Sequence, residues 1–188
     1  MPWAAALPVL AGAVVATTFA VSAVAKVRDL DGFHHTITLF TPLPDRVARW
    51  TAPAVVALEA LLVALLAAGV VLGAGGAIAA GLAGGVVLLA GYTAILARAR
   101  LQGTSVGCNC FGRTAQRLSW YDVVRNLLLL GVGGAGWAAS AEPAPPLAGA
   151  DTGLLVITGA ALTVLVIHLG DVAEVLRRPL ALDLEDAS

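Results

Sequence analysis

Residues 52–97 of the sequence read APAVVALEALLVALLAAGVVL-GAGG-AIAAGLAGGVVLLAGYTAILA. Each long apolar run has the length that crosses a bilayer, about 20 residues. The glycine-rich link at residues 73–76 permits only a tight turn, so the two runs are predicted to pack as an antiparallel helical hairpin. Gly81 and Gly85, four residues apart in the second run, would allow another helix to approach closely.

The rest of the chain has the same character: 59% of its 188 residues are hydrophobic and 12% are charged. Soluble domains are about half apolar and a quarter charged, so this chain is expected to be a multi-pass protein of the plasma membrane. The first apolar run is longer than a signal-peptide core and has no basic region before it, so it is expected to remain as a span. Five spans are predicted in one all-α domain of residues 1–188: residues 3–27, 52–72, 74–97, 118–141 and 152–169.

The connection between the first two predicted spans is long and mixed in composition. Phe33, Ile37, Leu39 and Phe40 are spaced like the apolar face of a helix, and prolines follow them. An interfacial helix over about residues 29–41, lying on the membrane surface, is therefore predicted.

Positive charge predicts the orientation of the chain, because Lys and Arg are retained on the cytoplasmic side. Ten of the eleven Lys and Arg residues fall between spans one and two, between spans three and four, or after span five. These ten are Lys26, Arg28, Arg46, Arg49, Arg98, Arg100, Arg113, Arg117, Arg177 and Arg178. The amino terminus is thus expected outside, and the connection between spans three and four inside.

Polar residues within spans are costly and usually have a partner or a function. Glu59 in span two and Arg125 in span four, with Asn126 beside it, each lie about eight residues from the predicted cytoplasmic end of their span. A Glu59–Arg125 ion pair is the resulting prediction, since a guanidinium can hold a carboxylate at two points. The pair could lock the helices together, Glu59 could relay protons, or Arg125 could stabilise a nearby thiolate.

His168 and Asp171 lie three residues apart near the predicted cytoplasmic end of span five, and hence on one helical face. His168 could reach the connection between spans three and four and accept a thiol proton there. It could equally be an ordinary residue of the membrane interface.

Cys108 and Cys110, the two cysteines of the chain, stand in that same connection, in the run Gly107-Cys-Asn-Cys-Phe-Gly112. As a redox pair, they could close a strained disulfide, which is the easily reduced and catalytic kind. As a metal site, they would suit Cu(I) or zinc but would need further ligands. As inert residues, they would be small and half-buried. All three interpretations remain open from the residues alone.

Three motifs, together with the order of the spans, resemble the methylamine utilisation protein MauE family within the wider DoxX-like group of redox-associated membrane proteins. They are KVRD with a following Phe within residues 26–33, CNCFG at residues 108–112 and RNLLLL at residues 125–130. The resemblance covers about residues 10–140. Asn109 departs from the glycine that is common in the family, but both cysteines are retained.

The resemblance implies a DoxX-like four-helix bundle, here with a fifth transmembrane helix. It also implies thiol–disulfide chemistry that supports maturation of the disulfide-rich small subunit of methylamine dehydrogenase, beside a thioredoxin-like partner. If catalytic, the chain would be a thiol–disulfide oxidoreductase. No cofactor is evident in the sequence; a membrane quinone is an electron acceptor by analogy only, and neither a metal nor a nucleic-acid partner is expected. The alternative is a non-enzymatic scaffold, or a metal-handling assembly factor, for a thioredoxin-like partner.

Overall fold

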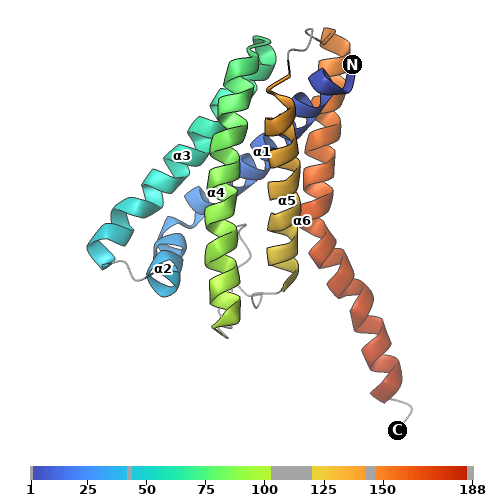
Figure 1. The fold of residues 1–188 in the computed structure, drawn as a ribbon. Coiled ribbons are helices and arrows are strands. Elements are labelled where there is room, and N and C mark those ends of the chain that lie inside the picture. The colour runs from blue at the N-terminus through green and yellow to red at the C-terminus, as the bar shows by residue number, and fades with distance from the viewer. Residues whose placement is uncertain (1, 42–43, 103–119, 143–146, 186–188) are drawn as a thin grey trace.

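The computed structural model describes the backbone of residues 2–41, 44–102, 120–142 and 147–185, and side chains within these ranges from residue 4 to residue 167. These residues form six helices and no strands (Figure 1). The helices are α1 (Pro2–Arg28), α2 (Leu30–Phe40), α3 (Asp45–Val71), α4 (Gly75–Leu101), α5 (Trp120–Ala139) and α6 (Gly149–Glu185).

Four of the described helices are long and apolar enough to cross a membrane: α1, α3, α4 and the first half of α6. The fourth predicted span, residues 118–141, corresponds to α5, which is 20 residues long and carries Asp122, Arg125 and Asn126 in its first two turns. The predicted all-α, polytopic membrane bundle is therefore confirmed.

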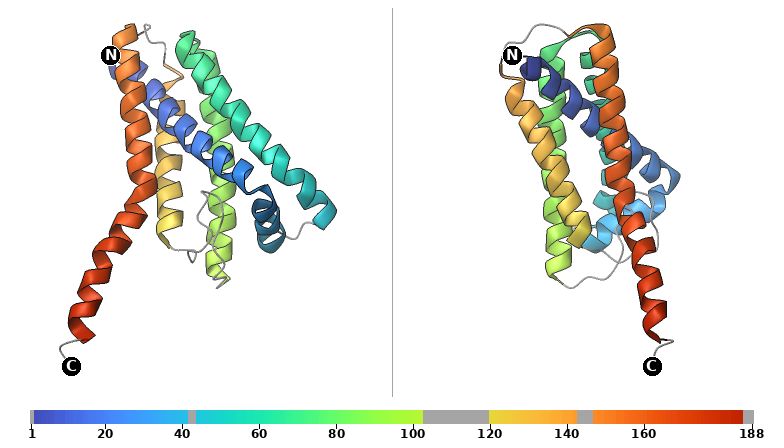
Figure 2. Two further views of the ribbon diagram at one scale, coloured as in Figure 1. Left: turned by 180° about the vertical axis from the view of Figure 1, so that it is seen from behind. Right: turned by 90° about the vertical axis from the view of Figure 1, so that its right-hand side faces the viewer.

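Helix α1 is the centre of the bundle. It runs obliquely across the other helices (Figure 2) and packs against α3, α5 and α6, while α4 packs between α3 and α5. Val15 and Phe19 of α1 are almost fully buried, together with Leu66 of α3 and Leu82 and Leu89 of α4. These apolar side chains form one core through the middle of the bundle.

The predicted hairpin of α3 and α4 is present, and its turn explains why a glycine stands there. Gly73 has a φ of 64°, a left-handed conformation that side chains disfavour. The N–H of Ala74 donates to the carbonyl of Gly69 at 2.8 Å, and the N–H of Gly73 donates to that of Val70 at 3.4 Å. This is the Schellman pattern that ends a helix.

Gly81 and Gly85, which are predicted to allow close packing, face two different helices. A Cβ atom at Gly81 would lie 2.7 Å from Leu66 of α3, whereas one at Gly85 would lie 2.7 Å from Val15 of α1. Helix α4 therefore approaches α3 at one glycine and α1 at the other. The four-residue step is not a single two-helix interface.

Helix α2 begins immediately after α1 because Asp29, which stands between the two helices, is the N-cap of α2. The Asp29 carboxylate accepts a hydrogen bond from the N–H of Gly32 at 3.0 Å, as an N-cap residue does. The apolar face of α2 packs on protein: Phe33 and Ile37 are buried against Ala48 and Ala52 of α3. Leu39, which was expected on that face, is 49% exposed.

Helices α3 and α6 exceed their predicted spans by the most residues. Helix α3 begins at Asp45, seven residues before the predicted residue 52, and an acidic residue favours such a start through the helix dipole. Helix α6 has 37 residues, and its second half projects away from the bundle (Figure 1). At about 1.5 Å per residue it exceeds the hydrocarbon thickness of about 30 Å, so it cannot lie wholly within a bilayer.

Candidate functional site

A buried ion pair links α1 to α3. The ammonium Nζ of Lys26, near the end of α1, contacts carboxylate atom Oε1 of Glu59, near the middle of α3. Lys26 is 1% exposed and Glu59 is 0% exposed. Charged side chains so deep in an apolar bundle need a partner, because isolated burial of either ion is highly unfavourable.

Two hydroxyl groups complete this site, which we term the Lys26–Glu59 network: Ser22, Lys26, Glu59 and Tyr92. Lys26 Nζ donates to Ser22 Oγ at 2.6 Å, and Ser22 donates to Glu59 Oε1 at 3.1 Å. The hydroxyl of Tyr92, on α4, donates to Glu59 Oε1 at 2.6 Å and lies 3.3 Å from Lys26 Nζ. Three helices thus meet at one carboxylate oxygen.

Two aromatic rings flank the ammonium group. Lys26 Nζ lies 5.1 Å from the ring centroid of Phe33 on α2 and 4.8 Å from that of Tyr92. Rings at this distance attract a cation through their electron-rich faces. The second carboxylate oxygen, Glu59 Oε2, is buried and has no hydrogen-bond partner among the described residues.

The spacing of polar residues along α1 explains why Lys26 points inward. Thr18, Ser22 and Lys26 are four residues apart, which places them on one helical face, and all three are at most 2% exposed. The sequence predicts Lys26 in the charged connection after span one, and this prediction is wrong because α1 continues to Arg28 and buries the Lys26 side chain. In the sequence, the four-residue spacing of Thr18, Ser22 and Lys26 within an apolar helix was the signal that these polar residues share one face.

The predicted Glu59–Arg125 pair is also wrong. Glu59 pairs with Lys26, whereas Arg125 Nη2 lies 3.8 Å from Asp122 Oδ1, one turn away on α5. The expected equal depth fails because α3 begins early: Glu59 is the fifteenth residue of α3, whereas Arg125 is the sixth residue of α5. Helix α3 packs against α1, α2 and α4, whereas α5 packs against α1, α4 and α6.

Arg125 and Asn126 nevertheless lie inside the bundle, where polar residues usually have a partner or a function. They are 5% and 2% exposed, and they share the inward face of α5 with Val123 and Leu129. Within the described part of the chain, the side-chain oxygen of Asn126 has no hydrogen-bond partner. Their supporting role beside the cysteines stays a prediction.

Cys108 and Cys110 lie outside the described residues, and so does the side chain of His168. The helix ends on either side of the cysteine segment are close together. The guanidinium carbon of Arg100, at the end of α4, lies 6.0 Å from the ring centroid of Trp120, the first residue of α5. Tyr121 donates a hydrogen bond to the carbonyl of Val166 at 3.1 Å, which ties the start of α5 to α6.

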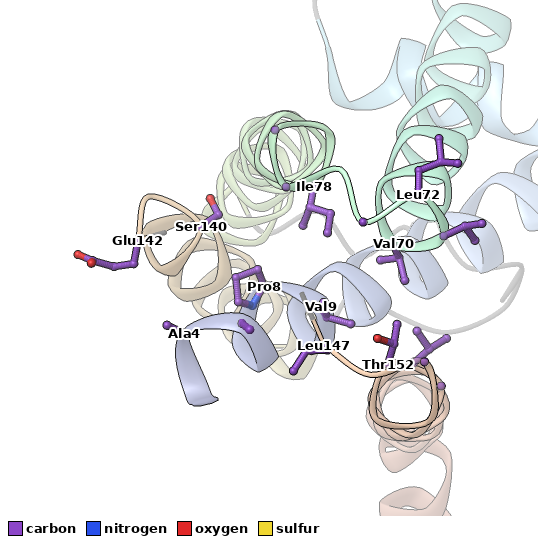
Figure 3. Close-up of a pocket in the computed structure, with 18 of the residues that line it drawn as sticks. Ala4, Pro8, Val9, Val70, Leu72, Ile78, Ser140, Glu142, Leu147 and Thr152 are labelled. Carbon is purple, nitrogen blue, oxygen red and sulfur yellow. The ribbon is translucent and has the colours of Figure 1, made fainter. Parts of the chain in front are cut away.

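An open cavity of about 920 Å³ lies at the opposite end of the bundle, near the amino terminus (Figure 3). Its walls are mainly apolar and include Pro8, Val9, Ile78 and Leu147. Glu142 is the charged residue of its lining and points away from the other labelled side chains in Figure 3. The described residues that line this cavity therefore do not gather ionisable groups as the Lys26–Glu59 network does.

The Lys26–Glu59 network can hold and exchange protons. Its ammonium, carboxylate and phenol groups are linked by short hydrogen bonds in a water-poor interior, where such groups interact strongly. No group of three or more metal-ligating side chains occurs among the described residues. Buried ionisable residues within membrane helices typically mark functional pathways.

Comparison with known proteins identifies the relatives of the chain. Residues 2–139 match the model of the family described as methylamine utilisation protein MauE, so the resemblance predicted from the three motifs is confirmed. The matched residues include α1 to α5 and both cysteines. No curated protein and no solved structure matches the chain.

Proposed function

The chain belongs to the methylamine utilisation protein MauE family, and from this membership we propose that it performs thiol–disulfide exchange through Cys108 and Cys110. In this proposal the chain supports disulfide formation or maturation of a partner protein. The family name and the sequence resemblance favour methylamine dehydrogenase as that partner, with a thioredoxin-like protein assisting.

One observation carries the proposal. The Cys108-Asn109-Cys110 motif stands within the matched residues, in the segment that joins α4 to α5. Two cysteines one residue apart can form and break a mutual disulfide, with one sulfur attacking a partner and the other resolving the mixed disulfide. A multi-pass bundle then fixes this exchange at one membrane face.

The distribution of charge supports the cytoplasmic face for this segment. The helix ends that carry Arg28, Arg46, Arg49, Arg98 and Arg100 gather at one end of the bundle, opposite the amino terminus (Figure 1). Positive charge is retained in the cytoplasm. We therefore propose an external amino terminus and a cysteine segment that is reached from the cytoplasm.

The test is alkylation of oriented membrane vesicles with a membrane-impermeant maleimide, read as a mass shift of the protein. Because the chain has two cysteines, the expected result is two added labels from the cytoplasmic side, and only after reduction. Labelling without reduction would show resting thiols, contradict the redox proposal and favour the scaffold or metal-handling alternative. Labelling from the outside would contradict the orientation.

Two variants make the result specific. A Cys108→Ser, Cys110→Ser protein should take up no label. In that background, Gly75→Cys places a single thiol in the exposed turn between α3 and α4, at the other end of the bundle. This thiol should react only from the outer face, and labelling of both sites from the same side would overturn the arrangement.

A further inference from the structure

A small cavity lies between α2, α3 and α4. It has a volume of about 240 Å³, and its walls include Phe33, Ile37, Ile95 and Leu96. Phe33, Ile37 and Leu96 are buried, whereas Ile95 is 39% exposed, so the cavity opens to the surface of the bundle at Ile95. A molecule in the lipid beside α4 can enter there.

The walls of the cavity suit hydrocarbon and exclude polar ligands. Among the described residues that line it, none is charged and no polar atom faces its interior. The hydroxyls of Thr36, Thr41 and Thr51 donate to backbone carbonyls one turn back, at 2.9, 2.6 and 2.9 Å. The Tyr92 hydroxyl donates to Glu59 at 2.6 Å. A buried water needs about two to four polar partners, so neither water nor a hydrogen-bonding ligand is stabilised here.

The depth of the cavity matches the acyl chains of one leaflet. Its residues on α4 are Tyr92, Ile95 and Leu96, and α4 ends at Leu101. At about 1.5 Å per residue, all three lie within about 15 Å of that helix end. The hydrocarbon core of a bilayer is about 30 Å thick, so the cavity lies in the half of the core nearest the end of α4.

Arg98 lies where the headgroup of such a lipid would be. It is exposed and stands three residues after Ile95, so the two side chains are neighbours on the surface of α4. Apolar walls alone give little selectivity in a bilayer, because acyl chains are as apolar as leucine. A guanidinium adds selectivity, since it can bind a phosphate group at two points and attracts anionic lipids.

We propose that this cavity holds an acyl chain of an anionic phospholipid, and that Arg98 binds the phosphate group of the same lipid. The bound chain fills the space between α2 and α4, where Phe40 of α2 already packs against Leu96 and Ala99 of α4. The lipid thus helps to hold α2 on the bundle. The site includes neither cysteine, so the proposal is independent of the proposed thiol–disulfide function.

Photolabelling of the full chain tests the site. The protein is placed in phosphatidylcholine nanodiscs that contain a small fraction of phosphatidylglycerol with a diazirine in one acyl chain, and labelled peptides are read by mass spectrometry. We expect label on the α2 peptide that contains Phe33 and Ile37. A phosphatidylcholine probe with the same diazirine chain should label this peptide much less. Equal labelling by the two probes would overturn the assignment of an anionic lipid.

A matched pair of variants on α4 tests the acyl-chain part of the site. Ile95→Trp fills the opening of the cavity from a partly exposed position, while Val87→Trp adds the same ring at an exposed position outside it. Ile95→Trp should reduce label on the α2 peptide about tenfold, which corresponds to about 1.4 kcal/mol of binding. Val87→Trp should leave that label unchanged. Similar labelling of both variants would overturn the cavity as the site.

A second pair tests the headgroup contact without changing the cavity. Arg98→Gln should reduce phosphatidylglycerol label on the α2 peptide about fivefold, as expected for loss of one basic residue near the membrane surface. Arg28→Gln removes the same charge from α1, which does not line the cavity, and should leave the label unchanged. Equal loss in the two variants would overturn the role of Arg98, because it would reflect only the net charge of the protein.

Discussion

Lys26 and Glu59 are individually unfavourable residues for a membrane helix, and each is tolerated because the other is present. The pair is almost fully buried and is bonded to two hydroxyls, so the charges replace lost hydration with fixed contacts. At the scale of single residues, this network is the strongest departure of the bundle from apolar packing. It is also where a substitution should have the largest effect.

Lys26→Met is expected to destabilise the folded protein by about 3 to 5 kcal/mol, because it leaves the Glu59 charge buried without its cation. Adding Glu59→Leu removes the stranded charge, so the double variant should recover most of that loss. The measurement is the thermal unfolding midpoint of detergent-solubilised protein.

Arg28→Met is the control for that pair, since Arg28 is exposed and stands two residues from Lys26. It should change the stability by no more than about 0.5 kcal/mol. A double variant that is no more stable than Lys26→Met alone would contradict the account of Lys26 as the counter-ion of Glu59.

At the scale of elements, α5 and α6 approach α1 closely at positions where small residues stand. A Cβ atom at Gly136 of α5 would lie 2.3 Å from the Cβ of Ala11, and one at Gly159 of α6 would lie 2.8 Å from that of Ala13. The central helix is thus enclosed by glycines on its neighbours, which lets α1 be packed on several sides at once.

Gly136→Ala should therefore destabilise the bundle by about 1 to 3 kcal/mol, because the added methyl group forces α5 away from α1. Gly134→Ala, two residues earlier on α5, meets open space and should be neutral or stabilising, since alanine favours helix by up to about 1 kcal/mol over glycine. Unfolding midpoints of the two variants, measured side by side, test this. Equal destabilisation would contradict close packing at Gly136.

At the scale of the whole molecule, the bundle and the end of α6 are separate in space. Helix α6 packs on α1 along its first part, and its second half projects beyond the other helices (Figure 1). The bundle is thus built from α1 to α5 and the first half of α6. The projecting half should contribute little to its stability.

A chain that ends at Leu169 is accordingly expected to insert and unfold as the full chain does, within about 0.5 kcal/mol. A chain that ends at Leu147 lacks all of α6 and should be much less stable, because the α1 surface around Ala13 would lose its cover. Size-exclusion profiles and unfolding midpoints of the two truncations provide the measurement. Marked loss of stability in the longer truncation would show that the projecting half supports the bundle.

The sequence by itself determined the class of fold, the hairpin of α3 and α4 and the family. These follow from local features: runs of apolar residues must satisfy their backbone hydrogen bonds as helices in a bilayer, and a glycine-rich link of four residues allows only one connection. The three motifs likewise depend only on residue order.

Only the tertiary structure decided which charges meet. The sequence predicted Arg125 as the partner of Glu59, but the partner depends on which helices are neighbours and where each begins. Helix α1 lies between α3 and α5, so Glu59 meets Lys26, while Arg125 meets Asp122 within its own helix. A cavity lined by Phe33, Tyr92 and Leu96 also depends on the tertiary structure. Its walls come from α2, α3 and α4, whose arrangement no single stretch of sequence specifies.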